Sequence, residues 1–74
     1  MTQRRYLIVI EGDGDSFSSY APDLPGCVAT GDARDEVERE MRAAIAFHLE
    51  GLQLAGEPLP EPSEFTAVDV EVAA

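Results

Sequence analysis

The sequence contains few of the residues from which catalytic and metal sites are most often built. Its 74 residues include one cysteine, one histidine and no tryptophan. Cys27 has no partner for an internal disulfide, and as a nucleophile it would depend on His48, the only imidazole available as a base. Zinc sites combine several Cys and His ligands, which this composition does not offer. We therefore expect no metal and no cofactor, and we expect Cys27 to pack as a small apolar side chain.

Long hydrophobic runs are also missing. No N-terminal apolar stretch resembles a signal peptide, and none approaches the roughly 20 residues that a membrane-spanning helix needs. These absences predict a cytoplasmic protein with no membrane partner.

Positive charge is scarce as well. Five basic residues stand against fifteen acidic ones, so the formal net charge is -10. Nucleic-acid binding draws much of its affinity from Lys and Arg that neutralise phosphates, and this chain by itself is therefore not expected to bind DNA or RNA. A basic partner is the natural complement, because opposite charges steer association. The alternative is that the carboxylates only keep a small protein soluble.

The length allows one domain with a small core. A chain of this size buries only about 60% of the surface that its unfolded form exposes. Such a core seldom supplies more than ~3–5 kcal/mol. We predict a single domain over residues 1–74, and we expect self-association, as a homodimer or a homotetramer, to supplement the core.

Three short strands are predicted in the first part of the chain, because β-branched and aromatic side chains alternate with turn residues there. In the second strand, Phe17, Ser19 and Ala21 should lie on one face and Ser18 and Tyr20 on the other. The predicted strands are residues 5–11, 16–21 and 27–30, with a Gly- and Asp-rich turn at 12–15 and Gly31 closing the third strand.

A rigid corner is predicted between the second and third strands. Pro22 and Pro25 restrict φ and remove two backbone donors, while Gly26 permits a positive φ. These three residues are assigned an architectural role. Leu24 lies between the prolines, and its side chain must either fold back into the core or be offered to a partner.

A single helix is predicted over residues 33–55. Asp32 is the expected N-cap, and Asp35 and Glu36 place carboxylates near the positive end of the helix dipole. Gly56 should end the helix. Its apolar positions lie on one face, as expected for a helix that packs on a sheet: Val37, Met41, Ala44, Ile45, His48, Leu49 and Leu52.

Two large apolar residues of the predicted helix, Phe47 and Leu54, fall on the flank of that stripe. They mark a candidate contact between subunits, although single exposed apolar residues are common on protein surfaces.

The remaining residues predict a connector and a fourth strand. Pro58, Pro60 and Pro62 favour an extended, polyproline-like segment over 57–62. Residues 65–72 alternate as in a strand with one apolar face. The order is β-β-β-α-β, an α+β fold. A right-handed crossover would place the last strand beside the first and parallel to it, in the sheet order 3-2-1-4 with the helix on one face.

Scattered carboxylates suggest one enzymatic alternative, a metal-dependent nuclease. Glu11, Glu36 or Glu40, and Asp69 lie on three separate elements, and converging acids can hold two magnesium ions. Against this, the middle of the first strand, Ile8, carries no acid, and there is no basic patch to hold a substrate. Surface acids are the preferred interpretation.

The turn at 12–15 also resembles the start of a calcium-binding loop through Asp13 and Asp15. The resemblance fails at Leu24, which stands where that loop needs a bidentate carboxylate.

Several short motifs, in the same order and at similar separations, resemble the HicB antitoxins. They are the run PDLPGC from Pro22 to Cys27, then Gly31-Asp32, a helix rich in Glu and Ala, and the run GEPLPEPS over 56–63. The resemblance extends from Tyr6 to Val72. It implies a partial RNase H-like fold, which agrees with the β-β-β-α-β order.

The resemblance also implies a partner. HicB proteins neutralise HicA toxins, small basic ribonucleases, by docking over the surface that would meet RNA. A net charge of -10 suits such a partner. Many HicB antitoxins carry a further helix-turn-helix or ribbon-helix-helix segment that binds the promoter. No such element follows Val72, so we expect no C-terminal DNA-binding domain and no direct DNA binding by this chain.

The prediction from the sequence is therefore an antitoxin of a type II toxin–antitoxin system, which binds a HicA-like toxin and is not an enzyme. The alternative is an orphan HicB-like module, oligomeric and without a cognate toxin. The partner contact is predicted at Asp13, Asp15, Asp23 and Leu24, and structural roles are predicted for Pro22, Pro25, Gly26, Gly31 and Asp32.

Overall fold

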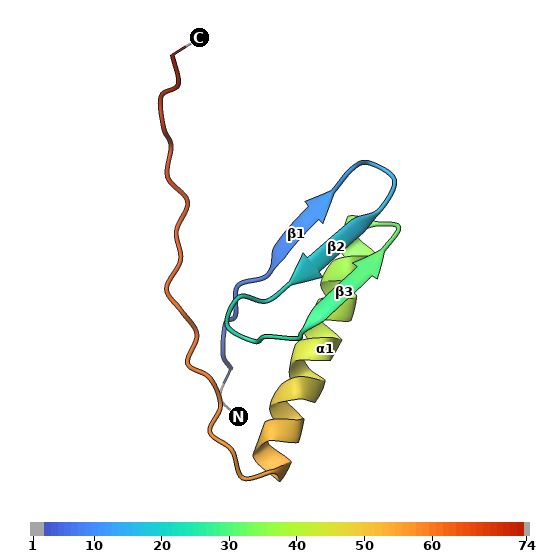
Figure 1. Cartoon of the computed structure of the whole chain (residues 1–74), viewed down its shortest axis with the longest axis vertical. Coiled ribbons are helices and arrows are strands. Elements are labelled where there is room, and N and C mark those ends of the chain that lie inside the picture. The colour runs from blue at the N-terminus through green and yellow to red at the C-terminus, as the bar shows by residue number, and fades with distance from the viewer. Residues whose placement is uncertain (1–2, 74) are drawn as a thin grey trace.

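The computed structural model describes residues 3–73. Its elements, in chain order, are β1 (Val9–Gly12), β2 (Phe17–Tyr20), β3 (Val28–Gly31) and α1 (Arg34–Leu54). β2 pairs antiparallel with both of its neighbours, so the sheet order is β1-β2-β3. α1 packs across one face of this sheet (Figure 1). The predicted α+β architecture of three antiparallel strands and one helix is confirmed.

β1 is shorter than the predicted strand at 5–11 because its partner ends early. The ladder stops where Val9 pairs with Tyr20. Two residues further along the same register, Pro22 would lie opposite Leu7, and proline has no N–H to donate to a ladder. The corner that follows β2 therefore limits the length of β1.

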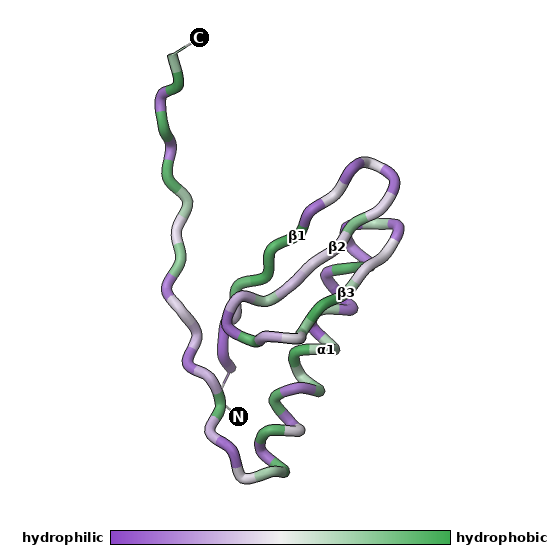
Figure 2. Tube along the Cα trace, viewed as in Figure 1, coloured by the Kyte–Doolittle hydropathy of each residue, from purple (hydrophilic) through white to green (hydrophobic). Residues whose placement is uncertain are grey.

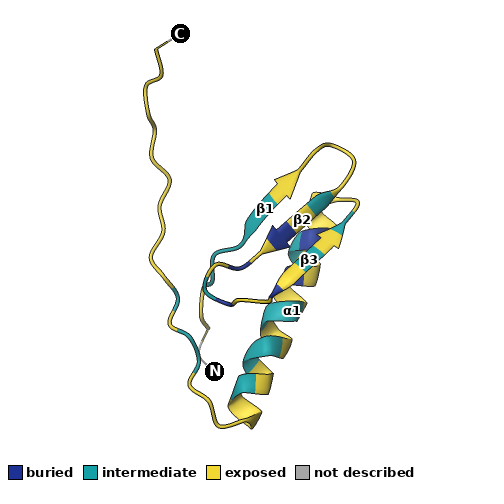
Figure 3. Cartoon of the chain, in the orientation of Figure 1, coloured by how far each residue is buried: buried dark blue, intermediate teal, exposed yellow. Residues whose placement is uncertain are grey.

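The two faces of the sheet differ in burial. On the face toward α1, Ser19 and Ala21 are buried and Phe17 is half-buried, whereas Ser18 and Tyr20 on the other face are exposed. The predicted alternation of β2 is thus confirmed. The outer face stays open to solvent, and its Val28 is 65% exposed (Figure 3).

The core is small and lies where the corner meets the first turns of α1. Its five buried apolar residues are Ala21, Leu24 and Cys27 from the corner and Val37 and Met41 from the helix. The N-terminal half of the predicted apolar stripe is therefore the half that is fully buried.

α1 extends well beyond the sheet. Its 21 residues span about 31 Å, whereas a strand of four residues spans only about 13 Å. Ile45, Leu49 and Leu52 are consequently only half-buried. On the flank, Phe47 is 79% and Leu54 is 82% exposed.

The start of α1 differs from the prediction, whereas its end agrees with it. Ala33, with φ -134° and ψ 146°, occupies the N-cap position and no side chain caps the helix, which corrects the prediction of Asp32. The chain stays extended through Ala33, so Asp32 lies one residue too early to cap. Gly56 does end the helix, with φ 73°. Its N–H donates to the Gln53 carbonyl while that of Glu57 donates to Leu52, as in a Schellman motif.

The fourth strand predicted at 65–72 is not part of the sheet, which is a correction to the predicted order 3-2-1-4. After α1 the chain turns back and leaves the domain as an extended segment on the β1 side (Figure 1). Apolar and polar side chains alternate along it (Figure 2), and Val68, Val70 and Val72 are at least 74% exposed. Extended backbone forms a strand only when a neighbour accepts and donates its hydrogen bonds, and in the described part of the chain no strand pairs with this segment.

Candidate partner-binding surfaces

The corner between β2 and β3 consists of two consecutive turns. The N–H of Leu24 donates to the carbonyl of Ala21 at 3.1 Å, and the N–H of Cys27 donates to the carbonyl of Leu24 at 3.1 Å. Pro22 and Pro25 each occupy the second position of a turn, where proline is favoured. Gly26 has φ 88°, the positive value for which a glycine was expected, and it follows Pro25 as in a type II turn.

Leu24 projects from this corner into the core. Its exposed fraction is 0%. The two turns bend the backbone so that the side chain between the prolines faces α1 and not solvent. This placement corrects the expectation that Leu24 contributes to a partner contact.

Asp23 binds a residue that is forty positions away in the chain. Its carboxylate accepts the Ser63 N–H at 2.8 Å and the Ser63 hydroxyl at 2.6 Å. These two bonds, the hydroxyl contribution first, lower the pKa of Asp23 below its ordinary value. Nothing in the spacing of Asp23 and Ser63 predicts this pair, because both residues lie in irregular segments.

Two residues of the N-terminal segment hold the same stretch of chain. The Tyr6 hydroxyl donates to the Pro60 carbonyl. Arg4 donates to that carbonyl at 3.3 Å and pairs with Glu61 at 3.6 Å. We call Arg4, Tyr6 and Asp23 the clamp. Together they anchor residues 60–63 to the domain.

Asp13 has a local role in the turn between β1 and β2. Its carboxylate accepts the N–H groups of Ser16 and Asp15, both at 3.0 Å. These bonds, that from Ser16 first, lower the pKa of Asp13. Gly14 allows the turn with φ 98°. Asp13 is exposed and held in a defined orientation.

The predicted contact residues do not form one surface. Asp13 and Asp15 lie at the β1–β2 turn, whereas Asp23 lies at the opposite end of β2. The structure instead brings the β1–β2 turn to the same end as Asp32, and a hollow of about 480 Å³ there is lined by Glu11, Asp13 and Asp32. We call Glu11, Asp13, Asp15 and Asp32 the acidic end. No arginine or histidine lines that hollow.

Gly31 allows the chain to pass closely beneath α1 at the acidic end. A Cβ atom on Gly31 would lie 3.1 Å from a methyl group of Val37, which is tighter than ordinary van der Waals contact. A small residue is needed here because the end of β3 touches the buried first turn of the helix.

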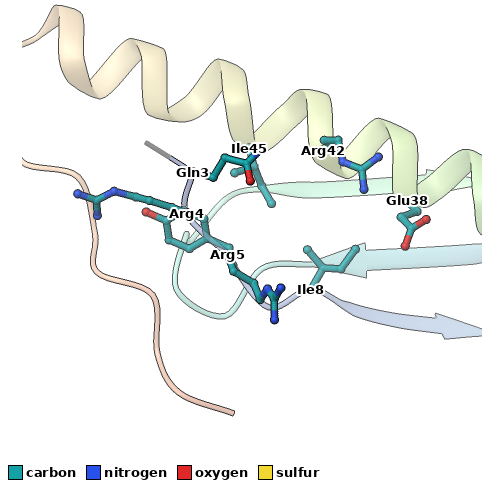
Figure 4. Close-up of a pocket in the computed structure, with 8 residues that line it drawn as sticks. Gln3, Arg4, Arg5, Ile8, Glu38, Arg42 and Ile45 are labelled. Carbon is teal, nitrogen blue, oxygen red and sulfur yellow. The ribbon is translucent and has the colours of Figure 1, made fainter. Parts of the chain in front are cut away.

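A second hollow, of about 650 Å³, lies between the start of β1 and the middle of α1 (Figure 4). It combines apolar side chains with three of the five basic residues of the chain. We call it the basic hollow, and it is lined by Gln3, Arg4, Arg5, Tyr6, Ile8, Glu38, Arg42 and Ile45. Sequence reasoning missed it, because Arg42 is brought to Arg4 and Arg5 only by the packing of α1 on the sheet.

The carboxylates considered for a nuclease site are not brought together. Asp69 lies on the exposed C-terminal segment, apart from Glu11 on β1. Within residues 3–73, no group of three or more His, Cys, Asp or Glu side chains could hold a metal ion.

Cys27 is buried in the core, 5% exposed, and burial raises its pKa. The thiol is therefore mostly protonated at neutral pH, a poor state for a nucleophile, and it packs as a small apolar side chain.

The described part of the chain, residues 3–73, contains no helix with the length and apolar character that crossing a lipid bilayer requires.

Comparison with known proteins identifies relatives of this fold. Over 56 residues the chain is 39% identical to an uncharacterized 14.9 kDa protein from the rep-hol intergenic region of Haemophilus phage HP1 (strain HP1c1), a match that covers 76% of this chain and 42% of the phage protein. The chain thus spans less than half of that relative. A chain from the solved HicA3 and HicB3 toxin-antitoxin complex matches with a TM-score of 0.66 and 33% identity, covering 81% of this chain and 70% of that one. The model of the HicB-like antitoxin of bacterial toxin-antitoxin systems matches residues 6–72, and the chain therefore belongs to the HicB-like antitoxin family.

Proposed function

We propose that this protein is the antitoxin of a type II toxin–antitoxin system and that it neutralises a small, basic, RNA-cleaving toxin of the HicA type by binding it directly. The observation that carries the proposal is the family match over residues 6–72, supported by the similarity to a chain of a toxin–antitoxin complex. The net charge of -10 suits a basic partner. In this proposal the protein acts in the cytoplasm and by binding, without catalysis.

The acidic end is the best candidate for the toxin contact. Three of its acidic residues, Glu11, Asp13 and Asp32, line one hollow, and no basic residue within 3–73 is part of that lining, so their fields add. Asp13 is held by two backbone N–H groups, and its lowered pKa keeps it ionised well below neutral pH. Carboxylates at one end of the sheet, with Asp13 held among them, present oxygen acceptors to cations that would otherwise contact RNA phosphates. The antitoxin would thus occupy the toxin's RNA-binding surface with negative charge.

Asp23 is less suited to a direct contact than the sequence suggested. Both of its carboxylate oxygens already accept hydrogen bonds from Ser63. We assign Asp23 to the positioning of the C-terminal segment, and the proposed contact narrows to Glu11, Asp13, Asp15 and Asp32.

Co-expression with the product of the neighbouring gene tests the proposal. The protein should restore growth of cells that express this toxin, and a small basic protein should co-purify with it. The informative variant is Asp15→Asn with Asp32→Asn, because neither side chain makes a hydrogen bond within residues 3–73. The matched control is Glu50→Gln with Glu57→Gln, which removes two exposed charges elsewhere.

The acidic-end variant should bind the toxin about tenfold more weakly at low salt, while the control should bind as the unmodified chain does. The difference should shrink as salt screens exposed charges. Equal binding by the two variants would exclude the acidic end as the contact. Continued toxicity, with no basic protein co-purifying, would reject the antitoxin proposal in favour of an orphan HicB-like module.

A further inference from the structure

The segment 64–73 has the pattern of a strand but no strand partner within residues 3–73. Its large apolar side chains Phe65, Val68, Val70 and Val72 are 48%, 76%, 74% and 84% exposed. Among the residues that the structure describes, its one hydrogen bond is local, from the Thr66 hydroxyl to the Ala67 carbonyl. An extended, alternating segment with open backbone N–H and C=O groups is a template for pairing with another strand.

With the segment 64–73 extended, the chain exposes more surface than a compact protein of the same mass. The accessible surface is 6085 Å², whereas a compact protein of 8.0 kDa exposes about 4,500 Å². The excess is thus roughly 1,600 Å² per chain. The radius of gyration, 14.8 Å, is likewise larger than the value of about 11 Å expected for this length. Stable obligate dimers bury on the order of 2,000 Å² or more in total, so the excess of two copies is large enough to form one.

The sheet has an edge at which such a segment can pair. Within residues 3–73, β1 pairs with β2 on one side and with no strand on the other. Beside the start of that edge lies the basic hollow, in which Ile8 and Ile45 are only half-buried. An added strand would cover these side chains beside the middle of α1 (Figure 4).

The basic hollow and the segment 64–73 also carry opposite charges. The hollow carries Arg5 and Arg42, together with Arg4, which is already paired with Glu61, against one acid, Glu38. The segment 64–73 carries three acids, Glu64, Asp69 and Glu71, and no basic residue. The two surfaces therefore match in both apolar character and charge. Each copy has a net charge of -10, but the Debye length of about 8 Å at physiological salt weakens repulsion between distant parts of two copies more than attraction at contact.

We propose that residues 64–72 of one copy form the fourth strand of a second copy's sheet, parallel to its β1, and that the two copies exchange these segments reciprocally. The clamp favours exchange over closure within one chain, because it bonds residues 60–63 to the domain and, within residues 3–73, the chain beyond them does not pair with its own β1. Reciprocal exchange gives a closed, two-fold symmetric dimer. It would also complete the sheet order 3-2-1-4, with the last strand supplied by the partner copy.

Crosslinking of two differently marked chains tests this directly. A tagged chain with Val9→Cys is mixed, unfolded and refolded with an untagged chain carrying Val68→Cys, and a short bismaleimide is added. Cys27 is buried with a raised pKa and should not compete in the folded protein. The expected product is a crosslinked heterodimer captured by the tag. Replacing Val9→Cys by Thr30→Cys, on the opposite sheet edge, should abolish the product.

The double substitution Val68→Asp with Val70→Asp provides a second measurement, the mass in solution by light scattering. The unmodified chain should be a dimer, and this variant should be a monomer with unchanged helix content, because neither valine is part of the core. Phe47→Asp, on the exposed flank of α1, is the matched control and should remain a dimer.

Three results would overturn the proposal. The first is a monomeric unmodified chain, and the second is an intrachain crosslink in a monomer that carries both Val9→Cys and Val68→Cys. The third is a dimer lost with Phe47→Asp but kept with the two valine substitutions, which would assign the interface to the helix flank. All measurements use the purified chain without a toxin, so their outcome is independent of the proposed antitoxin function.

Discussion

The corner at 21–27 and the segment at 64–73 are both apolar stretches outside the helix, and they have opposite fates. The corner supplies three of the five buried apolar residues of the core. The segment supplies four of the eight large apolar residues that are exposed. The corner is closed by three backbone hydrogen bonds of its own, whereas within residues 3–73 the segment has one local bond, from a side chain.

The difference shows that an apolar residue is buried reliably when contacts between near neighbours in the sequence direct it inward, and not when it depends on a distant segment. Pro25 and Gly26 set the backbone angles of a turn within a few residues, so Leu24 is directed inward by local chemistry. A strand has no such local solution, because its N–H and C=O groups can be satisfied only by a second strand. The corner is therefore complete within one chain and the segment is not.

The largest expected effect is that of Leu24→Ala. Removing a completely buried leucine side chain should cost about 3 kcal/mol, most of the stability of so small a core. Because only about 0–2 kcal/mol would then remain, thermal unfolding followed by circular dichroism should show a much lower midpoint and an unfolded fraction already detectable at room temperature. A melting curve like that of the unmodified chain would show that Leu24 is not in the core.

Gly26→Ala should have the next largest effect, with Gly51→Ala as its control. The φ of 88° at Gly26 should make a Cβ there cost about 1–2 kcal/mol. Gly51 lies inside α1 with open space around it, so alanine there should stabilise by about 0.5–1 kcal/mol. Urea unfolding of both variants measures the two shifts. If both substitutions changed the free energy of unfolding in the same direction, the turn geometry assigned to the corner would be contradicted.

Acid should weaken the bonds of Asp23 in the clamp and leave the corner at 21–27 intact. The pKa of Asp23 is lower in the folded protein than its ordinary value, so its contribution is fully present above the ordinary carboxyl pKa of about 4. It is lost as the pH falls through the lowered folded-state pKa. The protection factor of the Ser63 amide, which is its exchange rate relative to an unfolded amide at the same pH, should fall in that range while the corner amides stay protected.

Asp23→Asn should accelerate exchange at Ser63 already at neutral pH and should remove its acid dependence. Unchanged protection at Ser63 in this variant would show that Arg4 and Tyr6 hold the segment without Asp23.

The smallest effect is expected for Val70→Ala in dilute protein. Val70 is 74% exposed, and its truncation should change the free energy of unfolding by less than about 0.5 kcal/mol. At high protein concentration, where exchanged dimers form, the same variant should unfold earlier than the unmodified chain. A loss in dilute solution comparable to that of Leu24→Ala would mean that the segment packs within its own chain.

Much of the fold was predictable because its elements depend on near neighbours. The alternation of β2, the apolar stripe around Val37 and Met41 and the end of the helix at Gly56 follow from periodicity and backbone angles. The roles of Asp32 and Leu24 could not be predicted from such local signals. The N-cap depends on where the backbone leaves its extended form, and the fate of Leu24 depends on the direction in which the corner faces.

The candidate surfaces were less predictable. Asp13 and Asp15 were predicted as a contact and lie at the acidic end, but the addition of Asp32 and the separation from Asp23 depend on strand direction. The basic hollow requires α1 to lie across the lead-in to β1. The bond from Ser63 to Asp23 joins two loops that no periodicity relates.

The sequence by itself determined the three strands, the helix and the turn chemistry of the corner, since propensity, periodicity and the backbone limits of Pro and Gly act over a few residues. It also carried the motifs that relate the chain to the HicB-like antitoxins. Only the tertiary structure decided that Leu24 is buried, that Asp23 holds Ser63 and that residues 64–73 leave the sheet. Those outcomes depend on contacts between segments distant along the chain, which exist only once α1 has packed and the clamp has closed.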